Sequence, residues 1–298
     1  INPPLTGLVG QILHYELRID VMEGNTPAVE LRNILPTALA FQPGSLEVQT
    51  GSLGLLTGYV DEAQHLSLTG QDLFVNLGNV SNNADNNPNN DFITVEWDVI
   101  VLNNIFNDDG TEKTNIAAAH VETVLIDVDE FENLVIIEPD LTLTHTKLSP
   151  ASNIKLNNGT AVTYELEIKH TADSKNSAYD VLIEDVLDGA SGFLLVDSIL
   201  STGISPGVVT IVPTGGEGTG TLTGTYNIPL GGSVTIVFTA TVQDGFTPGQ
   251  SFDSVATLTW SSLPGTPVGE RTGAGVPDPN NIDDYFEIRT VFSEGAEP

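Results

Sequence analysis

The sequence predicts an all-β protein built from two tandem antiparallel β-sandwiches, and three observations lead to this prediction. Apolar and polar residues alternate along many short segments, which is the period of a strand with one buried face. One series of segments occurs twice in the same order, with the copies roughly 140–150 residues apart. Glycine (29) and proline (17) are frequent among the 298 residues. Because no stretch keeps a helical period for three turns, short strands joined by turns are favoured over helices.

The first strand of the repeated block shows the alternation most clearly in both copies. Period two places every second side chain on the same face of a strand. The apolar face is formed by Leu13, Tyr15, Leu17 and Ile19 in the first copy, and by Val162, Tyr164, Leu166 and Ile168 in the second. We therefore predict that Tyr15 and Tyr164 occupy equivalent positions.

Three further blocks match between the copies. Residues 31–35 match residues 183–187, ITVEWDVIV from Ile93 matches VTIVFTATV from Val234, and NIAAAHV from Asn115 matches SVATLTW from Ser254. Polar turn signals separate the strands, and Asp108-Asp109-Gly110 has the composition of a hairpin turn. We predict one sandwich over residues 1–138 and a second over residues 139–298, divided near Glu138-Pro139-Asp140.

The two copies differ at their start. The second copy has a further strand, Leu141 to Thr146, ahead of its first glycine, whereas few residues precede Gly10 in the first copy. We therefore expect the leading sandwich to lack its first strand. Either the segment starts after that strand, or another chain supplies it, and a strand from a neighbouring copy would imply a filament subunit.

The charge and composition restrict the classes of partner. Nine Lys and Arg residues stand against 40 Asp and Glu residues, which gives a formal net charge of −31. Such a surface repels nucleic acid and anionic membranes, and it attracts hard divalent cations. The chain has no cysteine, which excludes disulfides and cysteine nucleophiles. With no signal-peptide pattern and no apolar run long enough for a membrane span, we expect a mature or excised part of a longer protein.

Two acidic loops are the candidate metal sites. Asp85 and Asp91 lie in the Asn-rich run Asn82–Asp91, and Asp278, Asp283 and Asp284 form a second cluster. Calcium takes six to eight oxygen ligands in a flexible geometry, and Asp and Asn supply them. We expect Ca²⁺ at these five aspartates. The competing interpretation is a pair of solvated acidic loops, because Asn and Asp are also common turn residues.

The other polar residues predict structure rather than chemistry. A third acidic cluster flanks the junction and consists of Asp127, Asp129, Glu130, Glu132, Glu138 and Asp140. A cation there would neutralise repulsion between the domains, but the alternation in this stretch favours a solvated strand face. The five histidines are scattered, mostly on predicted strands, and we expect each to be a polar-face residue rather than a metal ligand. No catalytic or nucleotide-binding motif is present, so we expect no enzyme activity, no catalytic residues and no cofactor-binding residues other than the metal ligands.

The repeated block resembles a known family. A glycine, then Tyr-x-Leu-x-Ile, a polar turn and Ala-x-x-Val-x-Ile-x-Asp-x-Leu occur within Gly159–Asp188, and more loosely within Gly10–Pro36. This pattern is similar to the bacterial and archaeal surface-repeat domain named domain of unknown function eleven, from which the chain departs at Asn33 and Asp188. The resemblance implies immunoglobulin-like sandwiches arranged in arrays on cell-surface proteins and adhesins. It implies no ligand and no catalytic residue.

Two functions follow as expectations. The first is a calcium-stabilised structural segment of an adhesin stalk, surface layer or filament, with neighbouring repeats or copies of the same protein as partners. The second is a module that binds a surface glycan or a protein through loops such as Gly203–Gly220. For Lys147 the possible roles are an isopeptide cross-link to an Asn of the last strand, a salt bridge, or that of an exposed lysine.

Overall fold

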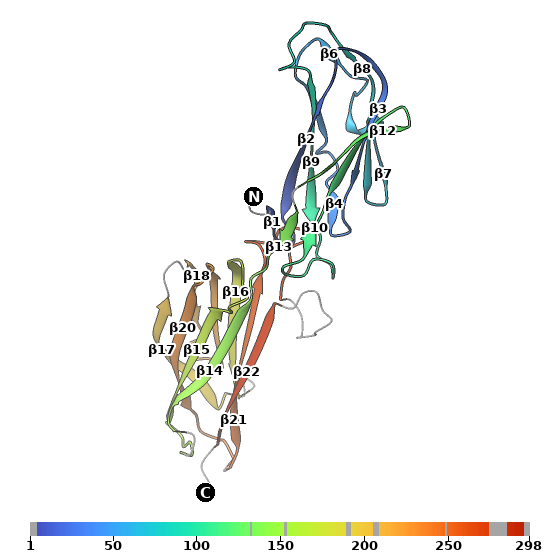
Figure 1. Ribbon diagram of the computed structural model, residues 1–298. Helices are drawn as coiled ribbons and strands as arrows, with labels where there is room; N and C mark the ends of the chain where they lie inside the picture. The colour runs from blue at the N-terminus through green and yellow to red at the C-terminus, as the bar shows by residue number, and fades with distance from the viewer. Residues whose placement is uncertain are drawn as a thin grey trace. The chain divides into compact units, whose positions relative to one another are not determined.

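The computed structural model describes residues 5–131, 133–151, 154–188, 192–204, 209–247, 249–273 and 285–294. The chain divides into two compact units, unit 1 (Ile1–Ile137) and unit 2 (Glu138–Pro298). Nearly all elements in both units are β-strands (Figure 1), and each unit has its own buried apolar core. The predicted all-β class with two tandem antiparallel β-sandwiches is confirmed. Among the described residues, no helix has the length and apolar character needed to cross a membrane.

Unit 1 is a sandwich of two sheets. Its strands are β2 (Ile12–Asp20), β3 (Gly24–Ile34), β4 (Leu39–Phe41), β5 (Glu47–Thr50), β6 (Leu55–Leu56), β7 (Leu66–Thr69), β8 (Asp72–Asn82), β9 (Phe92–Val101), β11 (Ile116–Val121) and β12 (Val124–Glu130). One sheet has the order β12-β11-β3-β8-β6, with β7 also paired to β8, and the other has the order β2-β9-β4, with β5 also paired to β9. Alternate side chains from both sheets form the core, with Trp97 among the largest.

A small third sheet adjoins this sandwich. It contains β1 (Leu5–Gly7), β10 (Glu112–Lys113) and β13 (Leu134–Ile136), with β1 parallel to β13. The Asp108-Asp109-Gly110 segment does form a turn, in which the Thr111 amide donates to the Asp108 carbonyl at 3.1 Å. The prediction of a hairpin was wrong, because β10 pairs with β13 and not with β9.

Unit 1 also contains a single helical turn, α1 (Glu62–His65), which alternation did not predict. Asp61 caps it, because its Oδ1 atom accepts a hydrogen bond from the Gln64 amide at 2.9 Å. An N-cap residue can satisfy an otherwise unpaired amide in so short a turn without any apolar face. The turn therefore follows from local capping and not from a helical hydrophobic pattern.

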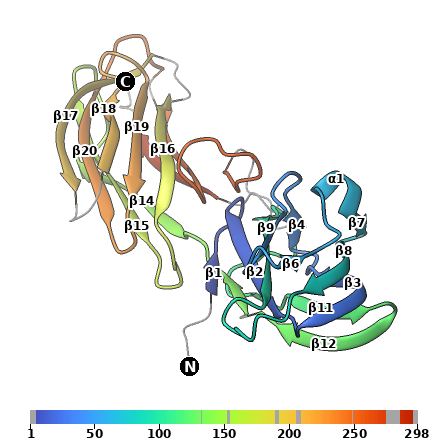
Figure 2. The ribbon, with the colours of Figure 1, turned by 90° about the horizontal axis from the view of Figure 1, so that it is seen from above.

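Unit 2 is a sandwich of a four-stranded and a five-stranded sheet (Figure 2). Its strands are β14 (Leu141–Ser149), β15 (Ala161–His170), β16 (Ala178–Leu187), β17 (Leu194–Ile204), β18 (Val209–Gly215), β19 (Thr221–Ile228), β20 (Ser233–Val242), β21 (Ser251–Ser261) and β22 (Phe286–Glu294). The sheets have the orders β14-β15-β20-β17 and β18-β19-β16-β21-β22. Tyr164, Tyr226, Phe238 and Phe252 are the largest fully buried side chains between them.

The two units use the same pairing registers. Tyr15 on β2 lies opposite Trp97 on β9, and Tyr164 on β15 lies opposite Phe238 on β20, the residue that matches Trp97 in the repeat. In the other sheet Asn33 lies opposite Ala117, and Asp185 lies opposite the matching Ala256. Tyr15 and Tyr164 therefore occupy equivalent positions, as the repeated blocks predicted.

The units differ at one sheet edge. In unit 2 the strand β15 lies between β14 and β20, and β14 contributes buried Leu141 and Leu143 to the core. In unit 1 the equivalent strand β2 pairs with β9 on one side, and no described strand pairs with its other side. The residues before β2 instead form β1, which joins the small third sheet. In unit 1, β2 is therefore an edge strand, whereas its equivalent β15 in unit 2 is an inner strand of its sheet. We call the unpaired side of β2 the open edge of unit 1.

Candidate metal site

Strand pairing brings three acidic residues to one end of unit 1. Glu23 lies in the connection between β2 and β3, Asp85 in the loop after β8, and Asp91 immediately before β9. The end of β2 is opposite the start of β9, at Asp20 and Phe92. The start of β3 is opposite the end of β8, at Gly24 and Asn82. Because the ends of these four strands meet at one end of the sandwich, carboxylates distant in sequence become neighbours.

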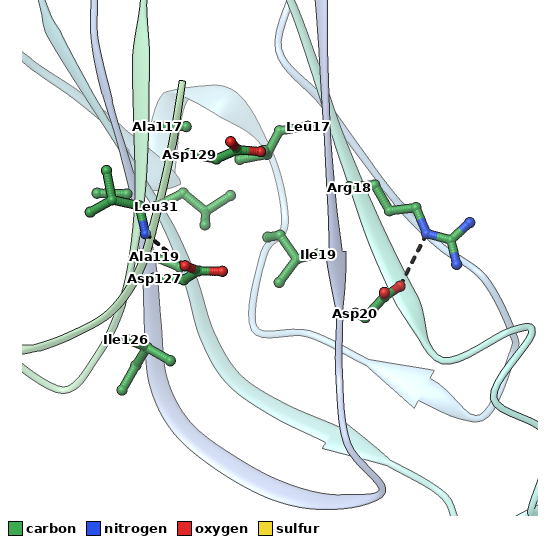
Figure 3. Close-up of a pocket in the computed structure, with 12 residues that line it drawn as sticks. Leu17, Arg18, Ile19, Asp20, Leu31, Ala117, Ala119, Ile126, Asp127 and Asp129 are labelled. Carbon is green, nitrogen blue, oxygen red and sulfur yellow. Dashed lines mark hydrogen bonds and ion pairs between the residues drawn. The ribbon is translucent and has the colours of Figure 1, made fainter. Parts of the chain in front are cut away.

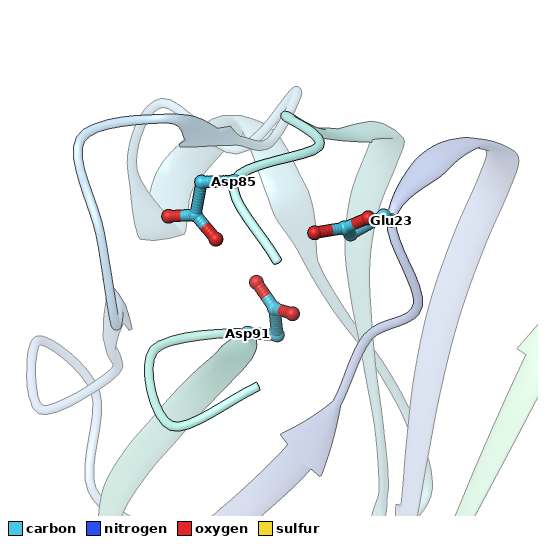
Figure 4. Close-up of side chains that lie close together, drawn as sticks. All are labelled: Glu23, Asp85 and Asp91. Atoms are coloured by element: carbon cyan, nitrogen blue, oxygen red, sulfur yellow. The ribbon is translucent and has the colours of Figure 1, made fainter. Parts of the chain in front are cut away.

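The three carboxylates share one space (Figure 4). One oxygen atom from each lies within 4.8 Å of the others. The loop amides hold two of them: Asn86 N donates to Glu23 Oε1 at 2.6 Å, and Asn87 N donates to Asp85 Oδ1 at 2.8 Å. The Asn90 side-chain amide donates to Asp85 Oδ2 at 3.2 Å. The loop thus fixes the orientation of Glu23 and Asp85.

Asp91 is the least satisfied member. Its Oδ1 atom is buried and has no hydrogen-bond partner among the described residues. Two carboxylates at this separation repel each other by about 1 kcal/mol in water, and by about 3–4 kcal/mol at an effective dielectric constant of 20. A hard cation would remove this repulsion and give Asp91 Oδ1 a partner. A donor set of three carboxylates fits Ca²⁺ better than Zn²⁺, which prefers nitrogen and sulfur.

The structure changes the list of expected ligands. It brings Asp85 and Asp91 together and adds Glu23, which sequence reasoning missed. Glu23 is far from both in sequence, and its only signal was the turn Glu23-Gly24-Asn25 at a strand end. The other expected ligands, Asp278, Asp283 and Asp284, lie outside the described residues.

The third acidic cluster does not assemble into a metal site within the described residues. Asp127 and Asp129 lie on β12, whose seven residues are all exposed, as expected of a solvated strand. Glu138 forms an ion pair with the buried Arg271 of unit 2. Asp140 accepts a hydrogen bond from the Thr171 hydroxyl at 2.5 Å.

His14 is an exposed histidine on β2 that faces acidic residues of β9. Its Nδ1 atom is 2.9 Å from Asp98 Oδ1, and its Nε2 atom is 3.7 Å from Glu96 Oε2. The hydrogen bond to Asp98 raises the pKa of His14, partial desolvation opposes this, and the charges of Asp98, Glu96 and Glu16 raise it further.

We expect His14 to titrate above its ordinary pKa of 6.5. Because the folded pKa is raised, the stabilisation is fully present below the unfolded pKa and is lost as the pH rises through the folded pKa. The effect on stability is small because the side chain is 58% exposed. An NMR titration of the imidazole measures the pKa of His14, and Asp98→Asn should lower the midpoint of that titration. A midpoint at or below the ordinary value in the unsubstituted chain would contradict this assignment.

A buried polar cluster crosses the core of unit 2. Asp185 Oδ1 accepts a hydrogen bond from the Ser254 hydroxyl at 2.7 Å, and Asp185 Oδ2 is 3.2 Å from His145 Nε2. The Ser254 hydroxyl is also 3.3 Å from His145 Nε2. These residue types can form a hydrolase triad, but the side chains of His145 and Asp185 are completely buried, and Ser254 is too. A substrate therefore cannot reach these side chains. The contacts among them link β14 in one sheet to β16 and β21 in the other. The prediction of a polar-face histidine was wrong for His145.

Lys147 also points into unit 2 from β14. Its Nζ atom is buried with no hydrogen-bond partner among the described residues, and burial lowers its pKa. It lies opposite Tyr164. Burial also raises the pKa of Tyr164, the charge of Asp185 adds to this, and a hydrogen bond with Ser293 opposes it. An isopeptide bond to the last strand needs an Asn or Asp there, and β22 contains neither. Within the described residues Lys147 forms no salt bridge, and its Nζ atom is not exposed.

Comparisons with known proteins give structural likenesses only. No family model matches the sequence, and no curated protein matches it. The C-terminal domain of the Streptococcus agalactiae antigen I/II polypeptide BspA superposes with a TM-score of 0.47 at 12% identity, over 87% of this chain and 92% of that one. The C-terminal domain of the Streptococcus pyogenes antigen I/II-family protein AspA gives 0.41 at 11% identity, over 86% and 90%. BcpA, the major pilin subunit of Bacillus cereus, gives 0.36 at 10% identity, over 96% and 69%.

Proposed function

We propose that this chain is a structural segment of an extracellular or cell-surface protein, in which two sandwiches in tandem act as a spacer in a stalk, surface layer or filament. The observation that supports the proposal most is the tandem repeat itself, with two units that share one strand register and have separate cores. The polar residues that could suggest catalysis are sealed in the core of unit 2. The net charge of −31 keeps such a segment soluble and apart from anionic surfaces.

Surface labelling tests this function. Antibodies raised against the folded chain should label intact cells of the source organism, and protease added outside the cells should remove the label. An antibody against a cytoplasmic protein serves as the control and should react only after the cells are lysed. Labelling of this chain only after lysis would contradict the proposal.

We further propose that calcium stabilises unit 1 through Glu23, Asp85 and Asp91. Three carboxylates within 4.8 Å store repulsion that a divalent ion removes, and loop amides already hold two of them in position. The ion would tie the β2–β3 connection to the loop between β8 and β9. Calcium is abundant outside cells, and extracellular modules use weak sites of this kind.

The alternative function, binding of a glycan or protein through Gly203–Gly220, stays a prediction. Residues 205–208 of that loop lie outside the described part of the chain. A glycan array probed with the chain tests it.

A further inference from the structure

The open edge of unit 1 borders a groove between its two sheets, which we call the β2–β12 groove. Leu17 and Ile19 of β2 line one side, Leu31 and Ala119 lie at its base, and the far wall is β12. The cavity volume is about 310 Å³. Figure 3 shows Leu17 and Ile19 on the side of β2 that faces β12, where Asp127 and Asp129 point toward them. Arg18 and Asp20 point away on the other side of β2, where they form an ion pair.

Unit 2 shows what fills the same place in the repeat. There β14 pairs antiparallel with β15, the equivalent of β2, and also contacts β22, the equivalent of β12. Leu143 lies opposite Ile168, and His145 lies opposite Leu166. Leu166 and Ile168 are completely buried as a result. Their equivalents in unit 1, Leu17 and Ile19, remain partly exposed. A strand in the groove would bury them in the same way, and burying a whole Leu or Ile side chain stabilises by about 1.5–3 kcal/mol.

The charge of the groove indicates the chemistry of its occupant. Asp127 and Asp129 lie opposite Ala119 and Ala117 on β11. The equivalent positions on β22 are Glu287 and Arg289, which form an ion pair with each other. Unit 1 thus has two aspartates where unit 2 has a neutralised pair. Each aspartate accepts a hydrogen bond only from the next backbone amide within the described structure, Val128 N and Glu130 N.

Unit 1 has no cation of its own to spare for these aspartates. Its Lys and Arg residues are Arg18, Arg32 and Lys113. Arg18 pairs with Asp20, Arg32 pairs with Asp72, and Lys113 donates to the Phe106 carbonyl. A ligand that enters the groove therefore has to bring the positive charge.

We propose that the β2–β12 groove binds an extended strand of a different polypeptide, antiparallel to β2, that carries both apolar and Lys or Arg side chains on its inward face. The apolar side chains and the aliphatic parts of the Lys or Arg side chains cover Leu17 and Ile19, and the cationic groups pair with Asp127 and Asp129. Main-chain hydrogen bonds to the free edge of β2 supply affinity, as in other cases of strand addition.

A second copy of this chain is a poorer occupant. The described strands of both units already pair within their own sheets, so none of these strands is free to be donated by a copy. Edge-to-edge pairing about a two-fold axis would bring the same acidic strands from each copy together. With 40 acidic residues against nine basic ones, this repulsion extends over the whole surface.

Synthetic peptides added to the full chain test the proposal. The probe is residues 141–149 of the chain, LTLTHTKLS, with His145→Lys, which gives the inward face two leucines and two lysines. The matched control has glutamate at both lysine positions, and a second control has the probe's composition in scrambled order. We expect saturable binding of the probe only, measured by fluorescence anisotropy. Hydrogen exchange should slow in residues 12–20 and 124–130, the two strands that border the groove.

Matched variants separate charge recognition from general attraction to an acidic protein. The double variant Asp127→Asn, Asp129→Asn keeps a hydrogen-bond acceptor for the neighbouring amides. It should weaken binding of the probe about tenfold. Asp108→Asn with Asp109→Asn removes the same charge from a turn elsewhere and should leave the affinity unchanged. Equal loss in both variants, equal binding of the glutamate peptide, or protection outside the two strands would overturn the proposal.

Two further outcomes would identify another role for the edge. Concentration-dependent protection of residues 12–20 without peptide would mean that a second copy fills the groove, and it would overturn the assignment to a different chain. Absence of peptide binding together with aggregation of the Asp127→Asn, Asp129→Asn variant would mean that the aspartates only guard an exposed strand edge.

Discussion

Asp185→Ala is expected to destabilise unit 2 by about 3–5 kcal/mol, because it removes the acceptor at the centre of a buried polar cluster. The substitution leaves the Ser254 hydroxyl without its 2.7 Å partner and removes the carboxylate that lies 3.2 Å from His145 Nε2. These side chains are completely buried, so bulk solvent does not hydrate the groups that lose the carboxylate. Domains are stable by only about 5–15 kcal/mol, so this loss is a large share.

The two tryptophans allow each unit to be measured separately. Trp97 lies in the core of unit 1 and Trp260 in the core of unit 2. In a Trp97→Phe background, fluorescence during urea unfolding reports on unit 2, and the midpoint should fall strongly with Asp185→Ala. Asp185→Asn should cost less, because unit 1 has Asn33 at the equivalent position, where it donates to Asn115 at 2.8 Å.

A repair experiment separates the polar cluster from simple loss of volume. Replacing the cluster with apolar residues, as in His145→Leu, Asp185→Leu and Ser254→Ala together, should recover part of the stability, because buried polar groups with no partner are the main cost. If the triple variant is less stable than Asp185→Ala, or if Asp185→Ala costs less than about 1 kcal/mol, the cluster does not stabilise unit 2 as argued.

Calcium is expected to raise the stability of unit 1 by about 2.7 kcal/mol when free calcium is about 100-fold above its dissociation constant. This corresponds to a rise in Tm of roughly 5–10 °C for a unit of this size. The reason is local: a bound ion removes the repulsion among Glu23, Asp85 and Asp91 and gives the buried Asp91 Oδ1 a partner. In a Trp260→Phe background, the fluorescence of Trp97 reports on unit 1.

The comparison is between chelator and millimolar calcium at the same high ionic strength, because monovalent salt also screens a net charge of −31. Asp91→Asn should abolish the response, whereas Asp109→Asn, which removes the same charge from a turn outside the site, should keep it. Equal melting temperatures with chelator and calcium would show that the acidity serves solubility only. Retention of the full response in Asp91→Asn would place the ion elsewhere.

Local patterns in the sequence predicted much of the fold. Residues 13–19 and 162–168 alternate with the period of a strand. Both segments are strands, and their apolar faces lie toward the cores. The repeated blocks predicted that the two units share their strand registers, because matching blocks occur in the same order in both copies and place equivalent residues opposite each other. What alternation could not show was α1, which depends on one capping side chain, or the pairing of β10 with β13 across the unit.

The candidate site was predictable only in part. Asp85 and Asp91 lie in one loop, so composition was enough to select them. Glu23 joined them only because β2 pairs with β9 and β3 pairs with β8, which no local pattern encodes. His145 was expected on a polar face because of its residue type, although period two places it on the same face as Leu141 and Leu143. It is buried because Asp185 and Ser254 offer polar partners inside the core.

The all-β class, the two copies with their shared register and the acidic character could be predicted from the sequence alone, since each depends on the residue types and their order along the chain. Which carboxylates converge, which polar groups are enclosed and which edge stays open depend on the folded arrangement of the strands. Distances between residues far apart in sequence are set by sheet pairing and by the packing of two sheets. The sequence suggested a missing strand beside β2, but only the structure showed a groove with partly exposed Leu17 and Ile19 and two uncompensated aspartates.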